Sequence, residues 1–212
     1  VPLGVERGVF ALGLRDEELR ARLLAECGLP AGAKLLLGIG RHHPEKRWPV
    51  VIKGVRRAGP GVGLVLMGQG MATAKLARVA AGVPHVRLIL PEYDRGRLAA
   101  TMASADAVIH GADAEPFGLV LYEALACGAP LIVPDAGGAA EVARAEYAET
   151  YRARDVEACA AAIGRLFGRD QAALRTAAAA AEVRSDVEHA AALVEHYRGV
   201  IQTRERPAGT AR

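Results

Sequence analysis

The segment "DAVIHGADAEPFGLVLYEALACGAPLIVPD" (residues 106–135) joins two short apolar runs through a stretch with helical character. The runs at 106–110 and 130–135 are apolar throughout, without alternating polar residues, which is typical of strands buried on both faces. The stretch 117–127 between them is expected to form a helix. A strand, a helix and a second strand in this order predict a parallel sheet flanked by helices.

The same alternation extends back to residue 34. We expect further strands at 34–40, 62–68 and 85–90, and helices at 49–59, 71–81, 94–104 and 137–146. Pro49 suits the first turn of its helix, because the amide that proline lacks would have no helical acceptor there. The pattern predicts the α/β class, with a mostly parallel sheet that occupies residues 34 to about 135.

Beyond residue 155 we expect helices alone, at 155–167 and roughly 169–204. The predicted organisation is therefore a linker and lead-in helix (1–33), a ligand-binding α/β domain (34–168), a C-terminal helical segment (169–204) and a polar, frayed tail (205–212). The chain begins with Val rather than Met, which suggests a fragment of a longer protein.

Composition disfavours several classes of function. The net charge is +3 and only 4% of the residues are aromatic, so nucleic acid is not expected as a partner. No apolar run approaches the roughly 18 residues of a membrane span, and the N-terminus has no signal-peptide layout, so we expect a cytoplasmic protein. Cys27, Cys127 and Cys159 lie far apart without a C-x-x-C pair, which favours buried free thiols over zinc or disulfides.

The segment "GIGRHHPEK" (38–46) follows the first predicted strand. In an open parallel sheet, ligands bind beyond the carboxyl ends of the strands. Gly38 and Gly40 would let a ligand approach the backbone, and Arg41 and Lys46 would offer two cations to a diphosphate. A solvated basic loop is the alternative.

A dinucleotide cofactor is disfavoured by the glycine spacing. His43 and Thr73 stand where G-x-G-x-x-G requires its third glycine, and no acidic residue ends a second strand about 20 residues later. The adjacent His42 and His43 point in different directions and would make a poor metal pair. His110 differs, because it ends a strand at the presumed ligand edge.

The stretch "EPFGLVLYE" (115–123) surrounds the start of a helix that we expect near Phe117. The backbone amides of residues 117–120 would then form an anion cradle, strengthened by the helix dipole. Glu123 could accept hydrogen bonds from a vicinal diol such as a ribose, and Glu115 could reach an attached sugar. The alternative is that Glu115 only offsets the dipole and that Glu123 is a surface residue. Gly138 opens another helix, where a structural turn is equally plausible.

Together these motifs resemble a known family. From Val1 to about Thr203, the chain resembles the C-terminal, nucleotide-sugar-binding domain of the large retaining glycosyltransferase family of GT-B architecture. The resemblance depends on "VPLGVERGVF", "GIGRHHPEKRW" and "VLMGQG", and above all on "HGADAEPFGLVLYEALACGAPLIVPDAGGAAE" (110–141). It implies a Rossmann-like three-layer αβα domain that forms one half of a GT-B fold.

The resemblance also implies roles for individual residues. Arg41, Lys46 and Glu115 would be catalytic: the two cations would steady the leaving nucleotide diphosphate, and Glu115 would contact the donor sugar. The other donor-binding residues would be Gly40, His110, Phe117, Gly118, Leu119, Val120, Glu123 and Gly138. Transfer would retain configuration and would need neither a metal nor another cofactor, because fixed cations and helix termini would stabilise the developing charge.

The N-terminal, acceptor-binding half of such an enzyme is missing. We expect the chain to bind a UDP- or GDP-linked sugar weakly without turning it over, and peripheral membrane contact could come only from the missing half. Leu3 and Glu6 replace the family's usual Asn and Asp. An epimerase or glycan phosphorylase of the same architecture, or a non-catalytic nucleotide-binding module, remains an alternative. The base and sugar would depend on the loop 91–97.

Overall fold

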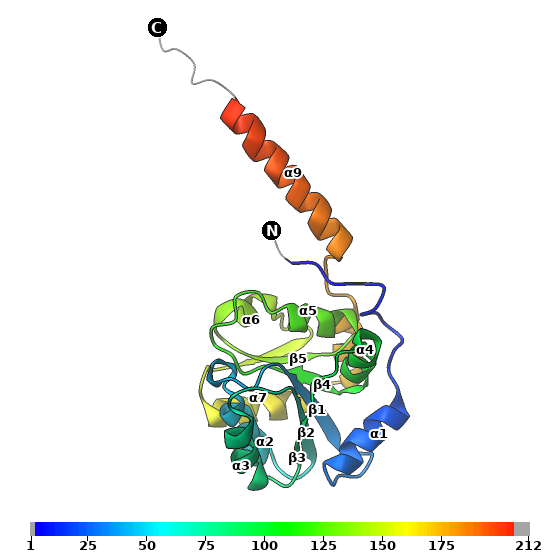
Figure 1. The fold of residues 1–212 in the computed structure, drawn as a ribbon. Helices are drawn as coiled ribbons and strands as arrows, with labels where there is room; N and C mark the ends of the chain where they lie inside the picture. The colour runs from blue at the N-terminus through cyan, green and yellow to red at the C-terminus, as the bar shows by residue number, and fades with distance from the viewer. Residues whose placement is uncertain (1–2, 206–212) are drawn as a thin grey trace.

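A six-stranded parallel sheet forms the centre of the computed structural model, which describes residues 3–205, with side chains up to residue 201 (Figure 1). The strand order is β3-β2-β1-β4-β5-β6. The strands are β1 (Lys34–Ile39), β2 (Val62–Met67), β3 (Val86–Ile89), β4 (Ala107–Ile109), β5 (Leu131–Pro134) and β6 (Ala148–Tyr151).

Helices cover both faces of the sheet and make three layers. One face carries α1 (Glu17–Glu26), α4 (Arg95–Ser104), α5 (Leu119–Ala126) and α6 (Gly137–Val142), and the other carries α2 (Trp48–Ala58), α3 (Thr73–Ala81) and α7 (Val156–Gly168). A short 3₁₀ helix, η1 (Pro44–Lys46), precedes α2, and α8 (Gln171–Ala179) contributes residues to both cores. The α/β class and the three-layer arrangement are confirmed.

Alternate residues of each strand supply the two cores. In β1, Leu35 and Leu37 pack on the α1–α4–α5 side, while Leu36 packs on the α2–α3–α7 side with the fully buried Trp48. This alternation follows from the period of two along a strand. It explains why the central strands are apolar almost throughout, since both of their faces are covered by helices.

The five predicted strands match β1–β5 to within one residue at each end. The sheet nevertheless extends beyond residue 135, because β6 pairs in parallel with β5 at the sheet edge. The prediction missed β6 because its sequence, "AETY", is short and places Glu149 and Thr150 at partly or fully exposed positions. An edge strand with polar residues has no distinctive apolar run.

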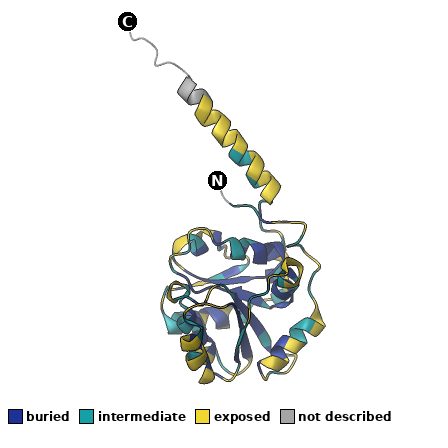
Figure 2. Cartoon of the chain, in the orientation of Figure 1, coloured by how far each residue is buried: buried dark blue, intermediate teal, exposed yellow. Residues whose placement is uncertain are grey.

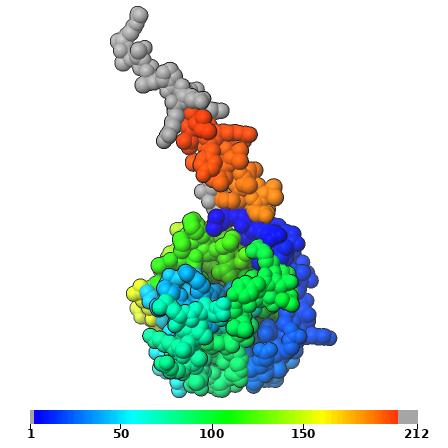
Figure 3. All heavy atoms as spheres, in the orientation of Figure 1, coloured from blue at the N-terminus to red at the C-terminus, as the bar shows by residue number. Residues whose placement is uncertain are grey.

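The predicted C-terminal helix also differs from the structure, and the helix predicted at 137–146 ends at Val142 as α6. The segment 169–204 is not one helix, because α8 ends at Ala179 and α9 (Asp186–Glu205) begins after a break. In that break, Val5 of the linker forms a parallel bridge with Ser185. α9 stands away from the body of the molecule and is largely exposed (Figures 1, 2 and 3). The predicted tail, 205–212, lies outside the described residues except for Glu205.

Among residues 3–205, none of the helices combines the length and the apolar composition that a bilayer crossing requires.

The contact between α2 and α7 generates a test of the packing. A Cβ added at Gly54 would lie 2.7 Å from Sγ of the buried Cys159, whereas one added at Gly164 of α7 would meet nothing within 4 Å. We expect Gly54→Ala to lower the free energy of unfolding by about 1–3 kcal/mol through overpacking. The matched variant Gly164→Ala should raise it by roughly 0.5–1 kcal/mol through helix propensity. Urea unfolding measures both, and equal stability of the two variants would contradict this packing.

Candidate functional site

The candidate site lies where the strand order reverses, between β1 and β4. In an open α/β sheet, this switch point opens a crevice beyond the carboxyl ends of the strands. The loop after β1 contains Lys46, and the loop after β4 begins at His110. The two loops touch, because a Cβ added at Gly111 would lie only 2.5 Å from the carbonyl oxygen of Lys46.

Lys46, Glu115 and His110 meet in this crevice. The Lys46 Nζ atom donates to Glu115 Oε2 at 2.6 Å, and Nε2 of His110 lies 3.4 Å from the same oxygen. The three side chains are only 17%, 14% and 1% exposed, respectively. The edge of the His110 ring faces Trp48, and Tyr151 of β6 donates to the His110 carbonyl at 2.7 Å. The sequence pointed to each of these three residues as a candidate, although not to this set of contacts.

The Glu115 carboxylate is held in its ionised form. Its contact with His110, together with the ion pair to Lys46, holds the pKa of Glu115 well below its usual range, although burial opposes this. The second oxygen, Oε1, accepts the amide of Gly118 at 3.3 Å. Because a carboxylate offers about four lone-pair sites, each oxygen can still accept a further hydrogen bond.

α5 begins at Leu119, two residues later than predicted. Gly118 precedes it with φ of +65°, a left-handed conformation that glycine adopts without a side-chain penalty. Within the described chain, the amides of Leu119 and Val120 donate to no backbone or side-chain acceptor. These donors at the helix N-terminus can receive an anion. The Phe117 side chain is 59% exposed beside them.

Gly138 braces the loop that carries Glu115. Its amide donates to the Glu115 carbonyl at 2.7 Å, so this N–H already has an acceptor. A Cβ at this position would lie 2.8 Å from that oxygen and 2.9 Å from the Pro116 carbonyl oxygen. A side chain here would push the loop away from α6.

Arg41 lies apart from this cluster. Its side chain is 75% exposed and pairs with Glu45 at 2.7 Å, while its carbonyl accepts from Trp48 Nε1. Arg41 and Gly40 line a hollow of about 420 Å³. The other lining residues come from β1, β2, the loop after β3 and α4: Ile39, Met67, Gly68, Gln69, Pro91, Glu92, Tyr93 and Leu98.

Glu123 lies in the second turn of α5 with 11% of its side chain exposed. Burial raises its pKa, against the opposing charge of Arg95, whose guanidinium lies 3.7 Å from Glu123 Oε1. Arg95 also binds Glu6 of the linker at 2.9 Å. The sequence pointed to Glu123 as a candidate and to Glu6 as a difference from the family's usual Asp. It gave no signal that connects either residue to Arg95.

Asp113 joins two arginines that the sequence analysis did not select. Arg47 donates to its carboxylate at 3.2 Å, and Arg154, which follows β6, also binds it. These hydrogen bonds lower the pKa of Asp113 although burial opposes them. The cluster ties the start of α2 and the β6–α7 connection to the Glu115 loop. In the sequence, only the adjacent positive charges of Lys46 and Arg47 indicated that this loop could bind an acidic side chain.

The structure therefore brings Lys46, Glu115, His110 and the start of α5 together, with Arg41 and Glu123 outside that contact. The hollow that Arg41 lines contains neither Lys46 nor Glu123. Nor does the described chain contain a group of three or more His, Cys, Asp or Glu side chains that could hold a metal ion.

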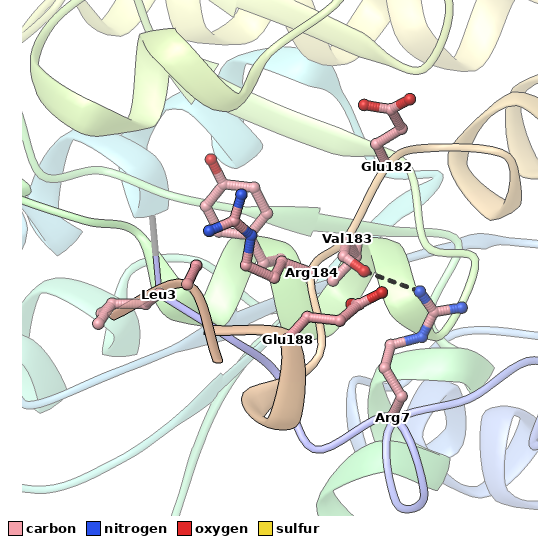
Figure 4. Close-up of a pocket in the computed structure, with 8 residues that line it drawn as sticks. Leu3, Arg7, Glu182, Val183, Arg184 and Glu188 are labelled. Carbon is pink, nitrogen blue, oxygen red and sulfur yellow. Dashed lines mark hydrogen bonds between the residues drawn. The ribbon is translucent and has the colours of Figure 1, made fainter. Parts of the chain in front are cut away.

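A separate hollow of about 640 Å³ lies where the linker meets the start of α9 (Figure 4). There Arg7 donates to the Val183 carbonyl at 2.8 Å. Its lining includes two arginines and two glutamates, Arg7, Arg184, Glu182 and Glu188. It contains none of the residues in the Lys46–Glu115 cluster.

The chain belongs to the family described as glycosyl transferases group 1, whose model matches residues 20–183. It is 34% identical over 151 residues to a D-inositol 3-phosphate glycosyltransferase of Segniliparus rotundus, covering 65% of this chain and 32% of that protein. It is 36% identical over 135 residues to a GDP-mannose-dependent alpha-mannosyltransferase of Mycobacterium tuberculosis, covering 64% and 33%. The chain thus spans about a third of the length of these relatives.

The fold is also shared with solved structures. Anabaena Alr3699/HepE in complex with UDP superposes with a TM-score of 0.78 at 20% identity, covering 92% of this chain and 56% of that one. The domain described here therefore corresponds in fold to about half of that chain. The predicted Rossmann-like half of a GT-B fold is confirmed.

The Lys46–Glu115 pair predicts a pH-dependent contribution to stability. We expect Glu115→Gln to lower the free energy of unfolding by about 2 kcal/mol at pH 7, because Lys46 loses its buried partner. The folded pKa of Glu115 is depressed, so its contribution is present above the unfolded value of about 4.3 and is lost as the pH falls below it. Urea unfolding from pH 7 to pH 3 should therefore show the difference shrinking.

The exposed Glu146, for which the structure shows no side-chain partner, provides the control. Glu146→Gln should change the free energy of unfolding by less than about 0.5 kcal/mol across the same pH range. A Glu115→Gln effect that stays constant with pH would mean that the carboxylate charge does not stabilise the fold.

Proposed function

We propose that the chain is the donor-binding domain of a metal-independent, retaining glycosyltransferase that uses a UDP- or GDP-linked sugar. The observation that carries this proposal is the Lys46–Glu115 pair, which lies at the sheet switch point beside the open N-terminus of α5. A fixed cation and unpaired amides bind phosphate, and a carboxylate next to them binds sugar hydroxyls. The family match favours glycosyl transfer over epimerisation, phosphorolysis or binding alone.

Lys46 and the amides of Leu119 and Val120 would receive the diphosphate. Arg41 would join them by leaving Glu45, and its exposed side chain is free to turn. As the bond from the sugar to the diphosphate breaks, negative charge grows on the leaving phosphate. Cations and amides that are already in place stabilise that charge without further reorganisation.

Glu115 would accept hydrogen bonds from the donor sugar through the lone pairs that Lys46 and Gly118 leave open. His110 would help to hold this carboxylate, and Gly138 would hold its loop. Glu123 would bind the ribose diol. In the described chain Glu123 is buried without a hydrogen-bond partner, which is unfavourable for a carboxylate. Two hydroxyl donors of the ribose would supply the missing hydrogen bonds.

The hollow beside Arg41 would receive the base. Its apolar floor, formed by Ile39, Met67 and Leu98, suits a planar ring, and the residues of the loop 91–93 line its rim. Gln69 donates to the Tyr93 hydroxyl at 3.1 Å. The acceptor would bind in the part of the enzyme that this chain does not include, so the isolated chain would bind the donor without transferring its sugar.

Titration calorimetry of the chain with UDP, GDP and their sugars tests this site. We expect Lys46→Ala to weaken binding of the preferred nucleotide by about 10–100-fold, because a charge-assisted contact to phosphate is lost. Lys53→Ala is the matched control, since Lys53 lies exposed on the neighbouring helix α2 and should leave affinity unchanged. Equal affinities of the two variants, or absence of binding by the unmodified chain, would reject the proposed site.

A further inference from the structure

Arg95 occupies an unfavourable position. It is the first residue of α4, where the helix dipole disfavours a cation, and Asp94 already caps this terminus through the amide of Arg97. Its guanidinium contacts side chains of two segments that lie far apart in the sequence, the linker and α5. It binds Glu6 of the linker, approaches Glu123 of α5, and lies 5.0 Å from the centre of the Phe10 ring.

The linker holds Glu6 in a defined place. The preceding residue, Val5, donates its amide to the Arg184 carbonyl, and its own carbonyl accepts the amide of Asp186 at the start of α9. The Glu6 carbonyl accepts the amides of Val9 and Phe10, both at 2.9 Å, and the Phe10 side chain is fully buried. The Glu6 carboxylate therefore projects from an ordered turn instead of a loose end.

The two carboxylates share Arg95 unequally. Glu6 Oε2 lies 2.9 Å from Nε, whereas Glu123 Oε1 lies 3.7 Å from Nη2, and both contacts are ion pairs. Glu123 is the more buried of the two, with 11% of its side chain exposed against 47% for Glu6. A buried carboxylate would be expected to take the closer contact. Glu6 therefore restrains the guanidinium.

We propose that Glu6 and Arg95 are positioning residues for the nucleotide: Glu6 holds Arg95 close enough to offset the charge of Glu123 and far enough away to leave its oxygens open for ribose hydroxyls. The proposal deepens the donor site and rests on the assignment of the ribose to Glu123. It also couples the linker to the site, because a displacement of Glu6 changes which carboxylate Arg95 binds.

Loss of either residue weakens nucleotide binding for a different reason. Without the Glu6 carboxylate, the guanidinium is free to form a hydrogen-bonded pair with Glu123 and to compete with the ribose. Without Arg95, Glu123 is left buried with no cation beside it. Because Glu6 acts only through Arg95, its removal has no further effect once Arg95 is replaced. The two substitutions are therefore non-additive.

The experiment is a double-mutant cycle by titration calorimetry. The ligands are whichever of UDP and GDP binds the unmodified chain more tightly, and its 2′-deoxy analogue. We expect Glu6→Ala to weaken binding of the ribonucleotide about 5–10-fold, the equivalent of one competing charged hydrogen bond. The effect of Glu6→Ala should vanish in the Arg95→Gln background. It should be smaller with the 2′-deoxy ligand, because that sugar has one hydroxyl fewer to compete with Arg95 for the Glu123 oxygens.

Two further variants separate positioning from folding. Glu6→Asp, which keeps the carboxylate, should restore part of the affinity, and Glu18→Ala on the exposed surface of α1 should match the unmodified chain. A general loss of structure would lower affinity for both ligands equally. It would also appear in thermal unfolding.

The outcomes distinguish failure of the Glu6–Arg95 coupling from failure of the donor-site assignment. If Glu6→Ala has no effect, or weakens binding equally in the presence and absence of Arg95, the coupling through Arg95 is wrong while the donor site stands. If Glu123→Gln and the 2′-deoxy ligand both leave affinity unchanged, the ribose does not bind Glu123, and the donor-site assignment fails with the coupling.

Discussion

The ion pair between Lys46 and Glu115 is the interaction on which the site depends. It joins the loop after β1 to the loop after β4 across the point where the sheet reverses its order. Because the pair is buried, leaving either charge without its partner costs about 2 kcal/mol of folding free energy. The same carboxylate accepts the Gly118 amide, so one contact fixes both the cation and the start of α5.

The sheet makes this contact possible. Carboxyl ends of parallel strands meet at one edge, so chemically active residues that follow successive strands are brought together there. That rule is why Lys46, His110 and Glu115 could be grouped from sequence alone. The central strands were predictable because helices on both faces require an apolar residue at every position, as in β2 and β5.

The rest of the site depends on contacts that leave no local pattern. β6 is an edge strand with polar positions, so its sequence has no recognisable strand pattern. Without β6, two contacts could not be predicted: Tyr151 of β6 donates to the His110 carbonyl, and Arg154, which follows β6, binds Asp113. The sharing of Arg95 between Glu6 and Glu123 likewise arises only when the linker, α4 and α5 are packed together. The helix start at Leu119 instead of Phe117 reflects the left-handed Gly118.

The charges at the site also bear on which ligand it suits. Lys46 is already neutralised by Glu115, so a free diphosphate entering beside it would meet a carboxylate as well as a cation. A diphosphate that carries a sugar would meet a better arrangement, since its hydroxyls can donate to Glu115 and separate the two negative groups. On this reasoning, the acidic residue beside the proposed phosphate cradle would make the site bind a glycosylated nucleotide more tightly than the bare one. Discrimination of this kind needs no contact with the base, because it is set by a carboxylate that the fold has already fixed in place.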